Sequence, residues 1–135
     1  QWDLVDRQDL KYRYLNAFDN AMIGLVSHVH NFQAKPVRKL WEKDDDQVLA
    51  FMRGDLLFVF NFSPMNSYNG YGILAPAGCY VPVLSTDDPA FGGFGNIDLT
   101  VKHLTQPDPL FEPAGVERLP LYLPARTALV LKKKR

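Results

Sequence analysis

The sequence predicts a mainly β protein, an antiparallel β-sandwich of about eight strands preceded by an α-helical segment. Three observations predict it. Apolar residues recur every three or four positions near the N-terminus, short β-rich runs divided by turn residues fill the remainder, and 47% apolar residues in a chain of 135 suffice for one packed core. We therefore expect a helical segment over residues 1–33 and an all-β domain over residues 34–135.

The helical segment is predicted from one apolar stripe. Its members follow at helical spacing: Leu10, Tyr14, Phe18, Met22, Leu25 and Val29. Asp9 suits the N-cap, but Asn16 and Asp19-Asn20 fit a break in the pattern, so one long helix and two short ones agree equally with the sequence. Such a stripe needs a surface to pack against.

The β domain is predicted from eight short runs. They are Val37–Lys43, Val48–Arg53, Leu56–Phe62, Tyr68–Leu74, Cys79–Ser85, Leu99–Leu104, Leu119–Leu123 and Thr127–Lys132. The turn residues Asp44–Asp46 and Gly54-Asp55 join the first three runs into a meander. The run from Leu56 to Phe60 is apolar on both faces, which predicts a central strand, whereas Arg38–Lys43 alternates and is expected to be half exposed.

Charge and cysteine content exclude several classes of protein. Fifteen basic and fifteen acidic residues give a net charge of zero, which argues against binding to nucleic acid or to a membrane surface. The single cysteine, Cys79, has no partner for an internal disulfide, as expected for a cytoplasmic protein.

No apolar run approaches the roughly 20 residues of a membrane helix, and the polar N-terminus does not resemble a signal peptide. A first residue Gln1 suggests a chain cut from a longer one.

The acidic clusters are interpreted as residues that favour turns. Asp44–Asp46 lies in an expected hairpin turn, where solvated aspartates are favoured. Asp87 and Asp88 precede Pro89 and a glycine-rich loop, Gly92–Gly95, which their side chains could orient through bonds to the backbone. No catalytic acid is assigned.

No metal or cofactor site is predicted. His28 and His30 face different directions on a helix and lack further ligands nearby, His103 is isolated in a strand, and Cys79 has no activating neighbour. Three further patterns are interpreted as structural: the glycine pattern Gly70–Ala75, which Pro76 interrupts, the glycosylation sequon Asn61-Phe62-Ser63 at the end of a core strand, and the basic tail Lys132–Arg135.

Five aromatic residues are candidates for contact with sugar. They are Trp41, Tyr68, Tyr71, Phe91 and Phe94, on expected strands or in glycine-rich loops. Flat rings with polar edges suit stacking on sugars, although rings also dominate the cores of small sandwiches. The sequence does not separate these two roles.

A series of short segments spans nearly the whole chain in a specific order: Trp2–Asp6, Leu10–Met22, Leu57–Phe62, Ser67-Tyr68, Tyr71, Pro76–Tyr80, Ser85–Asp88, Phe91–Gly93 and Leu121–Ala128. This order resembles the C-terminal end of the 1,4-α-glucan (glycogen) branching enzymes of the α-amylase superfamily, glycoside hydrolase family 13. The resemblance implies that the helical segment ends a catalytic (β/α)8 barrel, with its apolar stripe against that barrel. It also implies that the rest is the all-β C-terminal domain packed on the barrel.

The resemblance also sets the expected function. The longer enzyme cleaves an α-1,4 linkage, holds the glucan covalently, and transfers it to a 6-hydroxyl to form an α-1,6 branch in glycogen. The family's catalytic Asp, Glu and Asp lie upstream of the segment that Trp2–Asp6 matches, so no catalytic residue is carried over. We expect this chain to be a non-catalytic, cytoplasmic fragment of such a transferase. Its expected partners are the parent barrel and α-glucan, and its expected role is to stabilise the barrel and to aid glucan binding.

Two alternatives belong to other functional classes. A free-standing α-glucan-binding module would bind glucan as a monomer without a barrel. A purely structural interaction domain would lack glucan affinity and would associate through the apolar face of the helix.

Overall fold

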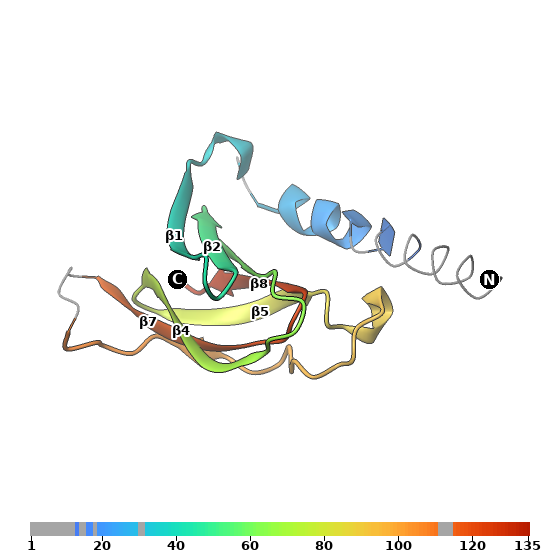
Figure 1. The fold of residues 1–135 in the computed structure, drawn as a ribbon. Coiled ribbons are helices and arrows are strands. Elements are labelled where there is room, and N and C mark those ends of the chain that lie inside the picture. The colour runs from blue at the N-terminus through green and yellow to red at the C-terminus, as the bar shows by residue number, and fades with distance from the viewer. Residues whose placement is uncertain (1–12, 14–15, 18, 30–31, 111–114) are drawn as a thin grey trace.

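The computed structural model describes residues 13, 16–17, 19–29, 32–110 and 115–135. Among these, residues 13, 16–17 and 19–27 are helical and form what we call the N-terminal helical segment (Figure 1). The elements that follow are η1 (Phe32–Ala34), β1 (Val37–Lys43), β2 (Val48–Arg53), β3 (Leu56–Asn61), β4 (Tyr68–Pro76), β5 (Cys79–Ser85), η2 (Pro89–Phe91), β6 (His103–Leu104), β7 (Val116–Leu123) and β8 (Thr127–Lys133).

The strands form two antiparallel sheets. One has six strands in the order β1-β2-β3-β8-β5-β6, and the other pairs β4 with β7. Figure 1 shows β4 and β7 on one side of the larger sheet and the N-terminal helical segment on the other. The predicted mainly β, antiparallel sandwich is therefore confirmed.

The main core fills the space between the two sheets. Its buried members alternate along the strands, as the period of a pleated strand requires. They are Val48, Ala50, Met52, Leu57, Val59, Ile73, Ala75, Tyr80, Leu119, Leu121, Leu123, Leu129 and Leu131. β3 is buried along both faces, which confirms the predicted central strand, whereas β1 forms a largely exposed edge.

The opposite face of the six-stranded sheet carries a second apolar cluster. Its buried members are Leu56, Phe58, Leu84 and Val130. Met22, Leu25 and Val29 of the predicted helical stripe pack against this cluster, because an apolar sheet face must be covered. This contact leaves Met22, Leu25 and Val29 half-buried, and packing of the stripe on a separate barrel stays a prediction. Leu10, Tyr14 and Phe18 lie outside the described residues.

The sixth predicted strand is much shorter than expected. Only His103–Leu104 of the run from Leu99 to Leu104 pairs, with β5. The backbone N–H and the hydroxyl of Thr100 both donate to Asp98 Oδ1, at 2.9 and 2.6 Å, so a local turn replaces strand pairing there. Across the described part of the chain, no helix is long and apolar enough to span a membrane.

Candidate functional site

Three of the five aromatic candidates meet at the edge of the sandwich. Trp41 of β1 lies beside Tyr71 of β4, with their ring centroids 6.2 Å apart in an edge-to-face arrangement. Tyr68, also of β4, is 5.1 Å from Tyr71 between centroids. All three are partly buried against the main core. We call Trp41, Tyr68 and Tyr71 the aromatic cluster.

A chain of hydrogen bonds joins the aromatic cluster to the turn between β1 and β2. Trp41 Nε1 donates to Tyr71 Oη at 3.0 Å, and Tyr71 Oη donates to Asp46 Oδ2 at 2.7 Å. Tyr68 Oη donates to the carbonyl oxygen of Asp46 at 2.8 Å. The polar edges of the rings are thus engaged within the protein, which fixes the orientation of the rings.

Arg118 of β7 closes the other side of the cluster. Its guanidinium carbon lies 5.1 Å from the centre of the Trp41 ring, a cation-π geometry. Its Nε lies 3.0 Å from Asp108 Oδ2, and its Nη1 donates to the carbonyl oxygen of Gly72 at 3.1 Å. The Leu110 N–H and the Arg118 guanidinium lower the pKa of Asp108, so this ion pair is charged at neutral pH.

Tyr71 is held as a neutral phenol. Burial and, after it, the hydrogen bond to the Asp46 carboxylate raise the pKa of Tyr71 to about 12. The unfolded chain loses this proton near pH 10, before the folded chain does, so the stability that the raised pKa contributes falls as pH rises from about 10 to 12.

Tyr71→Phe is expected to destabilise the chain by about 1 to 2 kcal/mol, because it removes two hydrogen bonds and leaves Trp41 Nε1 without its acceptor. Urea denaturation at pH 7 measures this loss. Repeated between pH 10 and 12, it should show a smaller fall in stability for Tyr71→Phe than for the unsubstituted chain. Parallel pH curves for the two proteins would contradict the assignment of the raised pKa to Tyr71.

The other two aromatic candidates lie elsewhere. Phe91 of η2 packs against the second apolar cluster, on the opposite face of the larger sheet from β4. Phe94 follows in the glycine-rich loop and is 88% exposed. The five candidates therefore occupy three separate places.

The loop that carries Phe94 is built around a buried carboxylate. Asp87 is 2% exposed, and its oxygens accept bonds from Phe94 N–H at 3.4 Å and Ile97 N–H at 2.8 Å. Asp88 Oδ1 accepts from Ala90 N–H at 2.9 Å and caps η2. Asp87 therefore orients the glycine-rich loop through bonds to its backbone, whereas the Asp88 side chain caps the preceding turn of 3-10 helix.

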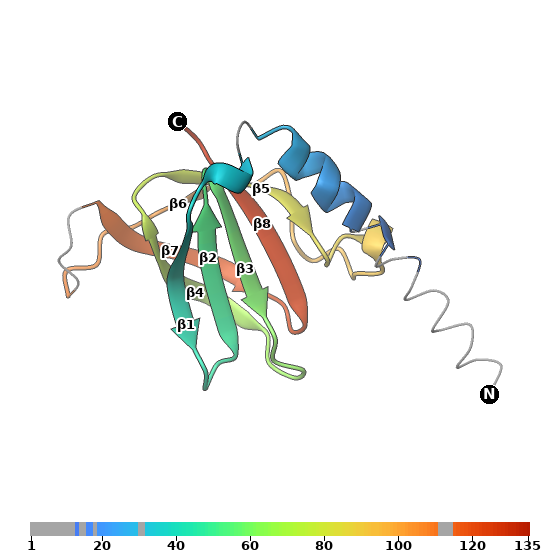
Figure 2. The ribbon, with the colours of Figure 1, turned by 90° about the horizontal axis from the view of Figure 1, so that it is seen from above.

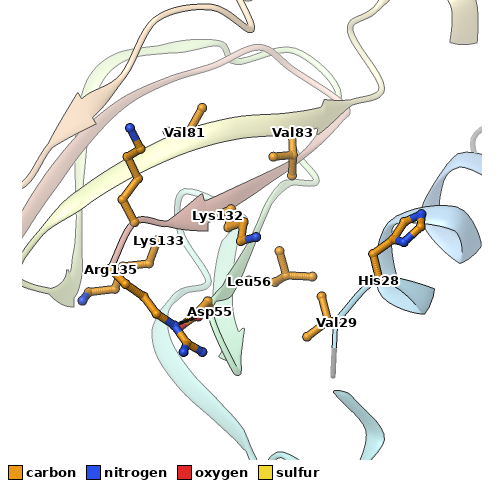
Figure 3. Close-up of a pocket in the computed structure, with 10 residues that line it drawn as sticks. His28, Val29, Asp55, Leu56, Val81, Val83, Lys132, Lys133 and Arg135 are labelled. Carbon is orange, nitrogen blue, oxygen red and sulfur yellow. Dashed lines mark hydrogen bonds and ion pairs between the residues drawn. The ribbon is translucent and has the colours of Figure 1, made fainter. Parts of the chain in front are cut away.

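A pocket of about 540 Å³ lies between the end of the N-terminal helical segment and the ends of β3, β5 and β8. Figure 3 shows basic side chains of the C-terminal residues on one side of it and His28 and Val29 on the other. Among the described residues that line it, Asp55 supplies the one side-chain carboxylate, which is 2.8 Å from Arg135 Nε. These described lining residues therefore offer neither paired side-chain carboxylates nor a nucleophile with an adjacent base.

The remaining polar candidates do not assemble. Among the described residues, no group of three or more His, Cys, Asp and Glu side chains lies close enough to hold a metal ion. His28 lines the pocket and His30 lies outside the described residues, while burial lowers the pKa of His103 on β6. Cys79 is a half-buried free thiol on β5.

Asn61 of the sequon is a structural residue. Its side chain is 1% exposed, and its Nδ2 donates to the carbonyl oxygens of Asn66, Leu123 and Pro124 at 2.8, 3.0 and 3.2 Å. Its Oδ1 accepts from Ser63 N–H at 3.0 Å. Every hydrogen-bonding atom of this amide is used inside the fold.

Sequence reasoning missed Asp46 and Arg118 as partners of the aromatic cluster. The sequence predicts that Asp46 is a solvated turn residue, and it predicts no role for Arg118. Both reach the cluster through the arrangement of β1, β4 and β7, which no local pattern in the sequence specifies.

Comparison with known proteins decides the family. The profile described as "Alpha amylase, C-terminal all-beta domain" matches residues 41–134. The chain belongs to this family. The match begins at Trp41 within β1 and ends just beyond β8, so the C-terminal all-beta domain comprises both sheets.

The curated relatives of this member of the C-terminal all-beta domain family are much longer than the chain itself. A protein of Yarrowia lipolytica described as 1,4-alpha-glucan-branching enzyme is 37% identical over 99% of this chain and 19% of its own length. One of Emericella nidulans with the same description is 40% identical over 97% of this chain and 19% of its own length. One of Solanum tuberosum is 41% identical over 80% of this chain and 13% of its own length. The chain thus spans about a fifth or less of these relatives.

Proposed function

We propose that this chain is the C-terminal part of a 1,4-α-glucan branching enzyme. The observation that carries the proposal is the match of nearly the entire chain to relatives described by that activity, of which it makes up a small share. In the complete enzyme, an α-1,4-glucan segment is cleaved and joined through a new α-1,6 linkage. Residues 1–33 would end the catalytic barrel, and residues 34–135 would form the C-terminal β domain.

The proposed role of the β domain is to stabilise the barrel rather than to supply catalytic groups. Four carboxylates of the described residues support this role. Asp87 orients a loop, Asp46 accepts from Tyr71, and Asp55 and Asp108 are paired with arginines. A glycosidic bond is broken by two carboxyl groups facing one cavity, whereas each of these four groups is engaged within the fold.

The test is a branching assay on the complete gene product and on a truncation that lacks residues 37–135. The complete protein should introduce α-1,6 linkages into amylose, measured by proton NMR and by loss of the iodine complex. The truncation should lose activity together with thermal stability, because its barrel loses a packed neighbour. Absence of α-1,6 linkages from the complete protein would contradict the activity. Their formation by residues 1–135 alone would contradict the non-catalytic role.

A glucan-contacting role for the aromatic residues is part of the proposal. Phe94 offers an exposed ring on a loop that Asp87 fixes, and the residues of the aromatic cluster are only partly buried. Electrophoresis of the chain through gels with and without glycogen tests this role. We expect glycogen to retard the unsubstituted chain and the control Leu110→Ser, and to retard Phe94→Ser less. Unchanged mobility of the unsubstituted chain would remove the role.

The cytoplasmic location stays a prediction, supported by the single cysteine. The relative of Oryza sativa is described as chloroplastic/amyloplastic, so the family includes proteins of other compartments.

A further inference from the structure

An asparagine followed by glycine lies at the start of β4. Of the asparagines in the sequence, only Asn69 precedes a glycine, which is Gly70. In such a pair the backbone nitrogen of the second residue approaches the side-chain amide of the first with the least hindrance, because glycine carries no Cβ. The surrounding fold decides whether this approach can occur.

The backbone at this pair departs from the regular pairing of β4 with β7. Tyr68 is opposite Leu123. The next paired residue, Tyr71, is opposite Leu121, so two residues of β4 face one residue of β7. Gly70 has a φ of 58°, the left-handed conformation of a glycine β-bulge. The extra residue of a bulge has no cross-strand partner, so its backbone is less restrained than that of a ladder residue.

Solvent reaches both residues of the pair. Asn69 and Gly70 are exposed. A Cβ at Gly70 would meet no atom within 4 Å, which shows that the space around this backbone is open. Neither burial nor a crowded neighbour therefore prevents the side chain of Asn69 from turning toward the following backbone nitrogen.

Two other asparagines show how a fold can block the same approach. Asn61 is buried, its amide donates to three carbonyl oxygens, and the N–H of Phe62 donates to a backbone carbonyl oxygen at 2.9 Å. Asn96 is exposed, but the N–H that follows it, from Ile97, donates to Asp87 Oδ2 at 2.8 Å. At both sites the nitrogen that would attack is engaged, and a bulky side chain stands beside it.

We propose that Asn69 is a site of spontaneous deamidation, with water as the co-reactant. The backbone nitrogen of Gly70 forms a bond to the side-chain carbonyl carbon of Asn69, and the bond from that carbon to Nδ2 breaks. The leaving nitrogen takes the proton that the Gly70 nitrogen gives up, so ammonia departs and a cyclic imide remains. Water then opens one of the two C–N bonds of the imide, which yields aspartate or isoaspartate at position 69. The reaction is independent of the proposed function.

The product should disturb the aromatic cluster. Isoaspartate places an additional CH2 in the β4 backbone between Tyr68 and Tyr71, whose hydroxyls both donate to Asp46. Figure 2 shows the segment that joins β3 to β4 at the same end of the sandwich as the turn between β1 and β2, which contains Asp46. The longer backbone shifts one ring relative to the other, so both hydrogen bonds cannot be kept without strain.

Peptide mapping of the complete gene product after incubation at mildly alkaline pH tests the proposal. The peptide that contains Asn69 should gain the mass that replaces NH2 with OH. An isoaspartyl methyltransferase should also transfer a methyl group from S-adenosylmethionine to that peptide. Restraints that raise the activation free energy slow a reaction exponentially, so Asn69 should react at least about tenfold faster than Asn61 or Asn96. Equal rates at the three sites would overturn the proposal.

A parallel incubation in urea separates the effect of the fold from that of the sequence. The rate at Asn69 in the folded protein should stay within about tenfold of its rate in urea, whereas Asn96 should slow by more than this on folding. A larger slowing at Asn69 would show that β4 blocks the attack, and it would overturn the proposal.

Asn69→Gln is the matched variant, because glutamine keeps an exposed amide but closes a larger ring much more slowly. After the same incubation, the unsubstituted protein should unfold at a lower urea concentration than before, and Asn69→Gln should keep its midpoint. An unchanged midpoint for protein that mapping shows to be modified would contradict the disturbance of the aromatic cluster.

Discussion

Gly93→Ala is expected to destabilise the chain by about 3 kcal/mol or more. A Cβ at this position would overlap both the carbonyl carbon and the carbonyl oxygen of Asp87. Neither atom can move freely, because the Asp87 carbonyl accepts from Gly95 N–H at 2.8 Å and its buried carboxylate holds Ile97. The added methyl group must therefore displace the loop from its anchor.

Urea denaturation measures this loss, and amide exchange locates it. The backbone N–H groups of Phe94 and Ile97 should lose protection against exchange. The N–H groups of the central strands should keep their protection when the two proteins are compared at the same free energy of unfolding. Gly24→Ala is the matched control, since its added Cβ meets nothing within 4 Å on a helical residue and should stabilise by up to about 1 kcal/mol. Equal stability of Gly93→Ala and the unsubstituted chain would show that the loop does not approach Asp87 as described.

Asn61→Asp is expected to destabilise the chain by roughly 3 to 5 kcal/mol. The amide Nδ2 of Asn61 donates to three carbonyl oxygens, which come from the segment after β3 and from the end of β7. A carboxylate of the same shape would turn a negative oxygen toward those carbonyls in a buried site. The loss therefore exceeds that of a missing hydrogen bond.

The pH dependence of this variant separates charge from shape. Burial among carbonyl oxygens raises the folded-state pKa of the new carboxyl above its unfolded value. The unfolded chain then releases the proton first as pH rises, so the variant should lose stability with rising pH and recover part of it under acidic conditions. Asn66→Asp adds the same charge at an exposed neighbouring residue and should change stability by less than about 0.5 kcal/mol. A pH-independent loss for Asn61→Asp would contradict the electrostatic cause.

The strands could be predicted well because local chemistry marks their ends. The turns at Asp44–Gln47 and Gly54-Asp55 divide the meander, and Gln47 and Gly54 take positive φ values of 58° and 59°. The error at Leu99–Thr100 arose where a single side chain, Asp98, bonds to the backbone and forms a turn within an apolar run. Such competition depends on geometry that apolar spacing does not record.

The candidate site could be predicted only in part. The residue types of the aromatic cluster were evident, but their meeting depends on the approach of β1 to β4 across the sandwich. The contact of the helical stripe with the sheet was not predicted for a related reason. The second apolar face of β3 was evident in Leu56, Phe58 and Phe60, but its position beside the helix is a property of topology. Local pattern specifies which faces are apolar, and the strand order specifies what each face meets.

The position of β8 has a consequence for biosynthesis. β8 lies between β3 and β5 and pairs with both, yet it is made after every other strand. While the ribosome is still translating the preceding residues, β3 and β5 each present an unpaired edge, and the six-stranded sheet cannot close. The sheet therefore closes late in synthesis. A chain that ends before Thr127 would expose the unpaired edges of β3 and β5, and we expect it to aggregate and to be degraded by quality-control proteases.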